Sequence, residues 1–317
     1  EALFELGALL IEQEGTEAQG IPYLQRCVDG PADVAKASAM RLETYYEDAE
    51  RWNDLARHLE SMLKKNTLTH EVGFRLRLSK LLDERLSDQK RALAILMAVS
   101  SGGDVGLLEA RAGLQRRLDL HGPLDKTLAA LAEAVSEPAR HAELQAERGD
   151  LLRFELNRSD LAIEAYGAAV ACAPEHEGAL RGLVDLYREQ ERIGELASTL
   201  GQLAEYVDGP EKTDLLTELA RVLLKPLGRP KEAQRAIRRA LELEPNEPEV
   251  IRAEIAIQVA LGDLDGALRQ YERLFEIYKD EGFDESPASF RVSVGQLYEQ
   301  NGQPSEALKW FKTALQD

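Results

Sequence analysis

The chain has 317 residues, with 57 acidic and 39 basic side chains and a formal net charge of −18 at neutral pH. Such a surface repels phosphate backbones and anionic lipid headgroups, so we expect neither nucleic acid nor a membrane surface as the main partner. Aromatic residues make up only 6% of the chain and no apolar run approaches the ~20 residues that span a bilayer, which argues against a β-sheet protein and against membrane insertion.

Apolar residues recur at helical spacing along the whole chain, and turn residues interrupt them regularly. The pattern predicts about nine repeats, each made of a first helix, a turn and a second helix. The predicted repeats are 1–30, 31–67, 68–103, 104–138, 139–174, 175–209, 210–245, 246–285 and 286–317. We expect them to form one solenoid domain. The start at Glu1 rather than Met indicates an excerpt of a longer chain.

Turn signals separate the repeats of the N-terminal half. Gly30-Pro31 follows the first repeat, and Trp52 opens the second helix of the second repeat. The run 100–103 (Ser-Ser-Gly-Gly) ends the third repeat, and Gly122-Pro123 is predicted to be the turn inside the fourth.

Two breaks stand out in the C-terminal half. Gly209-Pro210 separates the sixth repeat from the seventh. The acidic stretch 279–287 makes the exit from the eighth repeat unusually long. We expect this stretch to be a spacer, with a contact role for a partner as the alternative.

The last repeat, 286–317, shows the helix–turn–helix pattern most clearly. Val294-Gly295 and Tyr298 share one helix face, and Asn301-Gly302 ends that helix because glycine adopts the left-handed C-cap conformation. Ala307 and Phe311 lie on the apolar face of the second helix. Gly295 and Ala307 are small, as is required where the two helices approach closely.

The same register runs back through the chain. One anchor position recurs in each second helix at steps of about 35 residues, and the residues four and seven positions after it are all apolar. In a chain that is 44% apolar, chance does not explain this pattern. The anchors are Gly20, Leu55, Ala92, Thr127, Ala162, Leu196, Ala233, Ala267 and Ala307.

This spacing resembles the tetratricopeptide repeat, which has an apolar–Gly pair, an aromatic residue three positions later, and then Ala with an aromatic residue four positions beyond it. The likeness extends over essentially the whole chain, although Arg291 stands where the family often has Trp and the terminal Pro survives only as Pro174 and Pro245. It implies an all-α, right-handed α-solenoid superhelix whose first helices line a concave groove, and a function in protein–protein interaction.

Residues typical of catalysis or metal binding do not cluster in the sequence. No two of the five histidines have metal-ligand spacing within one repeat, and there is no C-x-x-C motif or glycine-rich phosphate loop. We expect a protein that is not an enzyme and needs no cofactor. Cys27 and Cys172 lie four repeats apart, beyond disulfide reach, which favours free thiols and a cytoplasmic location.

Charged residues on the first helices are the candidate binding site. The register places five arginines on the groove face, where planar guanidinium groups bind carboxylates bidentately. We therefore predict that the groove holds an acidic or C-terminal peptide of a partner. In the alternative, each arginine pairs with an aspartate of its own or a neighbouring repeat. The candidate residues are Lys80, Arg116, Asp150, Arg153, Arg181, Asp185, Arg188 and Arg221.

Three functions remain open at this point. The first is a scaffold or adaptor that holds an extended peptide or a helix of another protein. The second is a regulatory or substrate-recruiting arm of a larger protein whose enzymatic domain lies outside this sequence. The third is self-assembly through the uncapped last helix, whose apolar face would need a cover. That face comprises Ala307, Leu308, Trp310, Phe311, Ala314 and Leu315.

Overall fold

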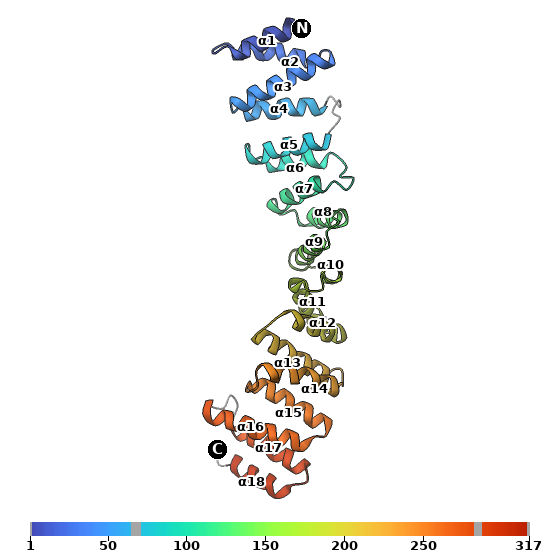
Figure 1. Cartoon of the computed structure of the whole chain (residues 1–317), viewed down its shortest axis with the longest axis vertical. Coiled ribbons are helices and arrows are strands. Elements are labelled where there is room, and N and C mark those ends of the chain that lie inside the picture. The colour runs from blue at the N-terminus through green and yellow to red at the C-terminus, as the bar shows by residue number, and fades with distance from the viewer. Residues whose placement is uncertain (1, 65–70, 282–286, 316–317) are drawn as a thin grey trace. The chain divides into compact units, whose positions relative to one another are not determined.

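The computed structural model describes residues 2–64, 71–281 and 287–315 (Figure 1). Within these ranges it contains eighteen α-helices, one π-helical turn and no β-strand. The prediction of an all-α protein built from helical repeats is confirmed. The chain divides into two compact units, Glu1–Ser136 and Glu137–Asp317, which we call the N-terminal and C-terminal units. The exact repeat limits and the right-handed sense of the superhelix stay predictions.

The helices alternate between first helices, with odd numbers, and second helices, with even numbers. The N-terminal unit contains α1 (Ala2–Glu12), α2 (Glu17–Cys27), α3 (Ala32–Asp48), α4 (Trp52–Lys64), α5 (Glu71–Glu84), α6 (Gln89–Met97), α7 (Val105–Arg117) and α8 (His121–Ala134). The C-terminal unit contains α9 (Pro138–Asp150), η1 (Leu151–Glu155), α10 (Ser159–Cys172), α11 (Glu177–Glu189), α12 (Ile193–Tyr206), α13 (Pro210–Leu224), α14 (Pro230–Leu243), α15 (Pro248–Leu261), α16 (Leu264–Glu281), α17 (Pro287–Gln300) and α18 (Pro304–Ala314).

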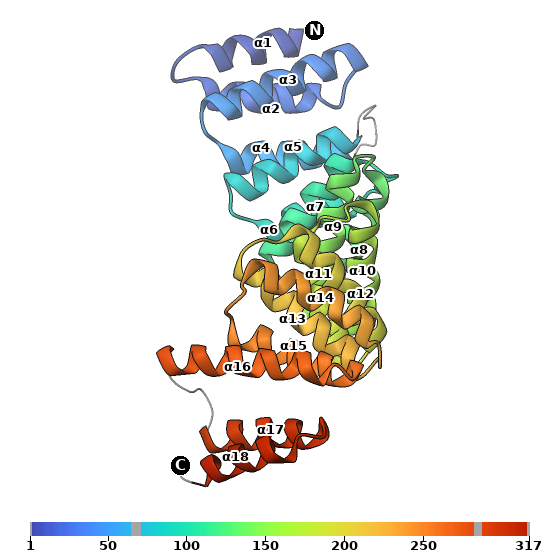
Figure 2. The ribbon, with the colours of Figure 1, turned by 60° about the horizontal axis from the view of Figure 1, so that its bottom comes forward.

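Each first helix packs against the second helix that comes after it, as α17 and α18 show side by side in both views (Figures 1 and 2). The anchor positions lie in these contacts. Ala92, Ala162, Ala233 and Ala267 have no exposed surface, and the other anchors are buried as well. The predicted register of the second helices is therefore confirmed. Burying such apolar side chains supplies most of the stabilisation of a helix that is too short to be stable alone.

The π-helical turn η1 continues α9, so that α9 and η1 form the first helix of the fifth repeat. A π turn inserts one extra residue into a helix and rotates the residues on its C-terminal side. Leu151 and Leu152 remain buried, whereas Phe154 is 62% exposed. Arg153, which lies within this π turn, forms ion pairs with the first helix of the sixth repeat, α11.

The turn of the fourth repeat differs from the sequence prediction, and the stretch 279–287 lies partly outside the described residues. Gly122-Pro123 is not the turn of the fourth repeat. The turn comes earlier, around Asp119 (φ +52°), and α8 begins at His121. Pro123 is tolerated there because the first N–H groups of a helix need no intrahelical acceptor. Of the stretch 279–287, α16 includes residues through Glu281, residues 282–286 lie outside the described part, and α17 begins at Pro287.

Helix α15 is apolar on two faces because it lies between two core clusters. Val250 and Ile257 pack with residues of α13 and α14, whereas Ile255 packs with α16 and α17. The same helix buries the carboxyl group of Glu254, which is 5% exposed. Gln258 Nε2 donates to Glu254 Oε1 at 2.7 Å, while Oε2 has no hydrogen-bond partner in the described structure. Burial raises the pKa of Glu254 above the ordinary carboxyl value.

Candidate functional site

The exposed face of α11 carries three of the predicted site residues at helical spacing. Arg181, Asp185 and Arg188 succeed one another at intervals of four and three residues, so their side chains lie on the same side of the helix. Arg181 and Arg188 are 42% and 49% exposed. The structure therefore brings these three together, as the register predicted.

Both arginines of α11 reach across to the next first helix, α13. Arg181 Nη2 donates to Glu211 at 2.9 and 3.1 Å, and Arg188 Nη2 donates to Glu218 at 2.9 and 3.0 Å. In each pair the Nε atom adds a further bond at 3.1 Å, which makes the contact a fork. Arg221 on α13 continues the pattern by pairing with Glu249 on α15.

Arg153 and Asp150 have different roles. Arg153, only 15% exposed, donates from Nη1 to Asp185 at 3.1 Å and from Nη2 to Glu189 at 2.8 Å on α11. Asp150 instead accepts a hydrogen bond of 2.6 Å from the Tyr166 hydroxyl, within the fifth repeat. Burial, followed by the neighbouring Asp150 carboxylate, raises the pKa of the Tyr166 phenol. The phenol is therefore a neutral donor at any physiological pH.

We call these cross-repeat pairs between first helices the arginine ladder. In the C-terminal unit its arginines are Arg153, Arg181, Arg188 and Arg221. The internal pairing that was the alternative to peptide binding is present at all four, although most acceptors are glutamates rather than aspartates. Exposed pairs of this kind contribute about 0.2–1 kcal/mol each. A role of these arginines in holding a partner stays a prediction.

The N-terminal unit contains the two remaining candidates and its own ladder pairs. Lys80 on α5 lies 4.0 Å from Glu84 of the same helix, and Arg116 lies exposed in the last turn of α7. The ladder pairs here were not predicted. They are Arg41–Glu12 between α3 and α1, Arg77–Glu43 and Arg77–Glu47 between α5 and α3, and Arg117–Asp83 between α7 and α5.

The ladder has opposite polarity in the two units. In the N-terminal unit the arginine lies on the later helix and the carboxylate on the earlier one, as in Arg77–Glu43. In the C-terminal unit the arginine lies on the earlier helix and the carboxylate on the later one, as in Arg188–Glu218.

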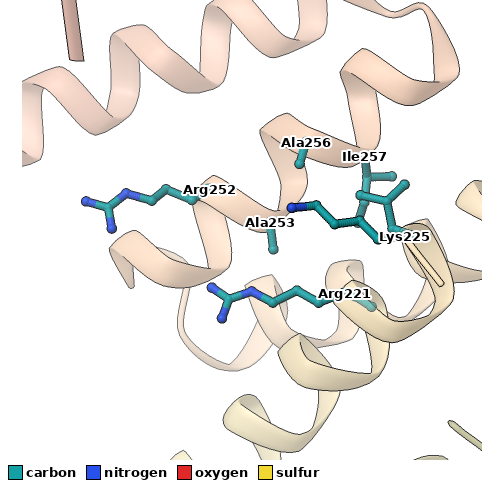
Figure 3. A pocket seen from close by; sticks show the side chains of 8 residues that line it. Arg221, Lys225, Arg252, Ala253, Ala256 and Ile257 are labelled. Carbon is teal, nitrogen blue, oxygen red and sulfur yellow. The ribbon is translucent and has the colours of Figure 1, made fainter. Parts of the chain in front are cut away.

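A hollow of about 310 Å³ opens between the first helices α13 and α15 (Figure 3). Its floor is apolar, and three cationic side chains form its rim. The floor residues are Ala220, Leu224, Ala253, Ala256 and Ile257, and the rim residues are Arg221, Lys225 and Arg252.

Glu249 on α15 pairs with two of the three rim cations. Glu249 accepts from Arg221 and, at 2.8 Å, from Arg252. The hydrogen bond from Arg221 is the main cause that lowers the pKa of Glu249, which therefore stays ionised. Arg252 also donates to the Tyr278 hydroxyl and lies 5.7 Å from the centre of its ring. Lys225, exposed just after α13, forms no ion pair with any described residue.

Lys225 and Arg252 were missed by the sequence analysis, although two signals were available. Lys225 follows Arg221 by four residues and so shares its helix face. Ala253 and Ala256 place small side chains on the facing part of α15, which leaves the hollow open.

Neither a metal centre nor a membrane span is found where the structure describes the chain. Residues 2–64, 71–281 and 287–315 contain no group of three or more His, Cys, Asp or Glu side chains arranged to hold a metal ion. Over the same ranges, no helix has the length and apolarity needed to cross a bilayer.

Residues 213–247 match the family model of the tetratricopeptide repeat. This segment is therefore identified as one tetratricopeptide repeat. The matched segment holds most of α13 and all of α14, so this tetratricopeptide repeat contributes one wall of the hollow. No curated protein matches the sequence.

Several solved structures are similar to this one. YrrB, described as a TPR protein with an unusual peptide-binding site, is 24% identical over 55% of this chain and 85% of its own, with a TM-score of 0.43. MamA is 22% identical over 57% and 92%, with a TM-score of 0.44. A tetratricopeptide-repeat protein from Parabacteroides merdae is 14% identical over 86% and 98%, with a TM-score of 0.36. At these TM-scores, individual residues of the known structures cannot be matched to residues of this chain.

Proposed function

We propose that this protein is a scaffold for protein–protein interaction that binds a partner segment along the exposed face of α11, α13 and α15. The observation that carries the proposal is the hollow between α13 and α15, where an apolar floor lies beneath cationic side chains. Binding surfaces combine these features, because apolar contact provides affinity and a few polar groups fix orientation. The segment is an extended peptide or a helix, and its acidic residues face the cationic side chains.

The arginine ladder is part of the same face. A partner carboxylate that approaches Arg181 or Arg188 meets a guanidinium group already bound to a glutamate. It must therefore displace or share that glutamate, which weakens binding at these positions. The rim of the hollow, where Lys225 is unpaired among the described residues, is the more favourable contact for an acidic segment.

Photo-cross-linking tests this function. A photo-reactive side chain at Asp214, exposed on α13, reports on the first-helix face. The same group at Arg235, exposed on α14, reports on the second-helix face and is the matched control. We expect partner proteins in the source lysate to cross-link at position 214 in preference to position 235. Equal yields at both positions would count against the first-helix face as the binding surface.

Self-association through the C-terminal helix is a second candidate function. Leu308 and Leu315 at α18 are 53% and 87% exposed. They lie seven residues apart and so share one face, and grouped exposed apolar side chains can mark an interaction site. Light scattering over a range of protein concentrations tests this function. A mass that rises with concentration in the wild type, but not in a Leu308→Glu variant, would support it.

We propose the cytoplasm as the location, supported by the free thiols of Cys27 and Cys172. We further propose that the chain has no catalytic activity of its own, because binding surfaces of this kind lack the enclosed cleft that shifts catalytic pKa values. A regulatory arm of a larger enzyme would use the same surface and so fits the same cross-linking result.

A further inference from the structure

We propose that the hollow between α13 and α15 receives one aliphatic side chain of an acidic partner segment, and that a neighbouring aspartate or glutamate of that segment binds Lys225. This inference rests on the proposed scaffold function and specifies the chemistry of its partner. The occupant is a segment of another protein in which an aliphatic residue stands next to a carboxylate.

The size and lining of the hollow select the aliphatic side chain. About 310 Å³ is near the lower limit of pockets that enclose a ligand, so the hollow admits a side chain but not a helix. Ala253 and Ile257 are at most 5% exposed and belong to the core, whereas Ala256 is half-buried and faces the opening. This floor offers no hydrogen-bonding side chain, and a polar group placed there would lose its water without compensation.

The charges at the rim select the carboxylate. Three cations border the hollow, and Glu249 is engaged by two of them, Arg221 and Arg252. In Figure 3 the Lys225 side chain extends from the end of α13 toward Ala253 and Ala256 of α15. Its ammonium group therefore stands beside the apolar floor, without an ion-pair partner among the described residues. A carboxylate next to the inserted side chain supplies that partner.

A basic segment fits this place poorly. Its cations would lie beside Lys225 and Arg252, and the carboxylate of Glu249 could reach them only by leaving two guanidinium groups. The net charge of −18 does favour basic partners at long range. However, charges farther away than the screening length of about 8 Å act weakly in physiological salt, so the rim decides the local preference.

Selection from a displayed library of random peptides tests the inference with the full chain as the target. We expect the enriched peptides to share an aliphatic residue next to Asp or Glu. One such peptide, made synthetically with a fluorescent label, is then titrated with the wild type and with Lys225→Glu. Charge reversal should weaken its binding about tenfold or more. The matched control Lys231→Glu, the same change at an exposed position on α14, should alter binding less than about twofold.

A second variant tests the floor independently of charge. Ala256→Trp fills the opening of the hollow from a half-buried position and should also weaken binding of the peptide. Circular dichroism of the variant checks that its fold is unchanged. Enrichment of Lys- or Arg-rich peptides, or binding that survives both Lys225→Glu and Ala256→Trp, would overturn the inference. A selection that enriches no peptide would overturn it as well. The scaffold function is decided separately by cross-linking at position 214, so the two failures are distinguishable.

Discussion

The ring of Tyr166 packs directly against the backbone of Gly182, a residue of the next repeat's first helix. A Cβ atom at position 182 would lie 2.6 Å from Tyr166 Cζ, and one at Gly149 would lie 2.5 Å from Tyr166 Cδ1. The ring, which is 1% exposed, thus fills the space between first helices α9 and α11. Both glycines are needed because the ring leaves no room for a methyl group on either side.

Gly182→Ala is therefore expected to destabilise the C-terminal unit. The added methyl group must push the ring or the helix aside, and such overpacking costs about 1–3 kcal/mol. The midpoint of urea unfolding measures the effect. Gly167→Ala is the control, because a Cβ there meets nothing within 4 Å and alanine favours a helix by about 1 kcal/mol. If both variants gained stability, the tight packing of Tyr166 would be refuted.

Tyr166→Phe isolates the hydroxyl group from the ring. The phenol donates to Asp150 at 2.6 Å, and its raised pKa keeps it protonated across the physiological range. Loss of this bond is expected to cost about 1 kcal/mol of unfolding free energy. Tyr166→Ala, which also leaves a cavity, should cost about 3–5 kcal/mol. Chemical denaturation of the two variants side by side provides the measurement, and equal losses would contradict a role for the hydroxyl group.

A double-mutant cycle on Arg188 and Glu218 measures one step of the arginine ladder. We expect a coupling free energy of about 0.5 kcal/mol, because water reaches both side chains, which are 49% and 33% exposed. The coupling should shrink in about 1 M salt, where charges are screened over ~3 Å. A coupling that is zero in dilute buffer would show that the pair does not stabilise the stack.

Lowering the pH should stabilise the protein through Glu254, whereas it destabilises a protein through the carboxylate of an ordinary ion pair. Its raised pKa means that the folded chain holds this proton more tightly than the unfolded chain does. Stability therefore decreases as pH rises from the ordinary carboxyl pKa through the raised one, and it stays lower above that point. Glu254→Gln should then stabilise the protein at neutral pH by about 1 kcal/mol, the scale of one unsatisfied buried group.

The pH dependence of the melting temperature checks this prediction. The advantage of Glu254→Gln should fade as the pH drops below the ordinary carboxyl pKa, where wild-type Glu254 carries its proton. Glu242→Gln, at an exposed position on α14, provides a comparison that should change little at either pH. A Glu254→Gln variant that is less stable than the wild type at neutral pH would refute this account.

The sequence was sufficient to predict the second-helix register. Ala233, Ile237 and Ala240 all have no exposed surface, as expected from the spacing of the anchor, because burial results directly from helical periodicity. The same periodicity placed Arg181 and Arg188 on one exposed face of α11.

The partners of those arginines could not be predicted. Arg188 and Glu218 lie 30 residues apart, and their contact depends on the rotation between two packed helices, which no local pattern encodes. The π turn at Leu151–Glu155, which continues α9 and carries Arg153, was not predicted from the sequence either. The hollow likewise depends on the distance between α13 and α15, so it became visible only in three dimensions.

The reversed polarity of the ladder limits how repeats can be exchanged. Deleting the α11–α12 or the α13–α14 repeat still brings an arginine-bearing helix before a carboxylate-bearing one, so opposite charges meet at the new junction. Moving the α3–α4 repeat into that unit would place Arg41 opposite a preceding arginine, and Glu43 and Glu47 opposite a following glutamate. A repeat moved between the units would therefore face like charges at both of its new junctions, whereas each ladder pair that it loses had contributed about 0.2–1 kcal/mol.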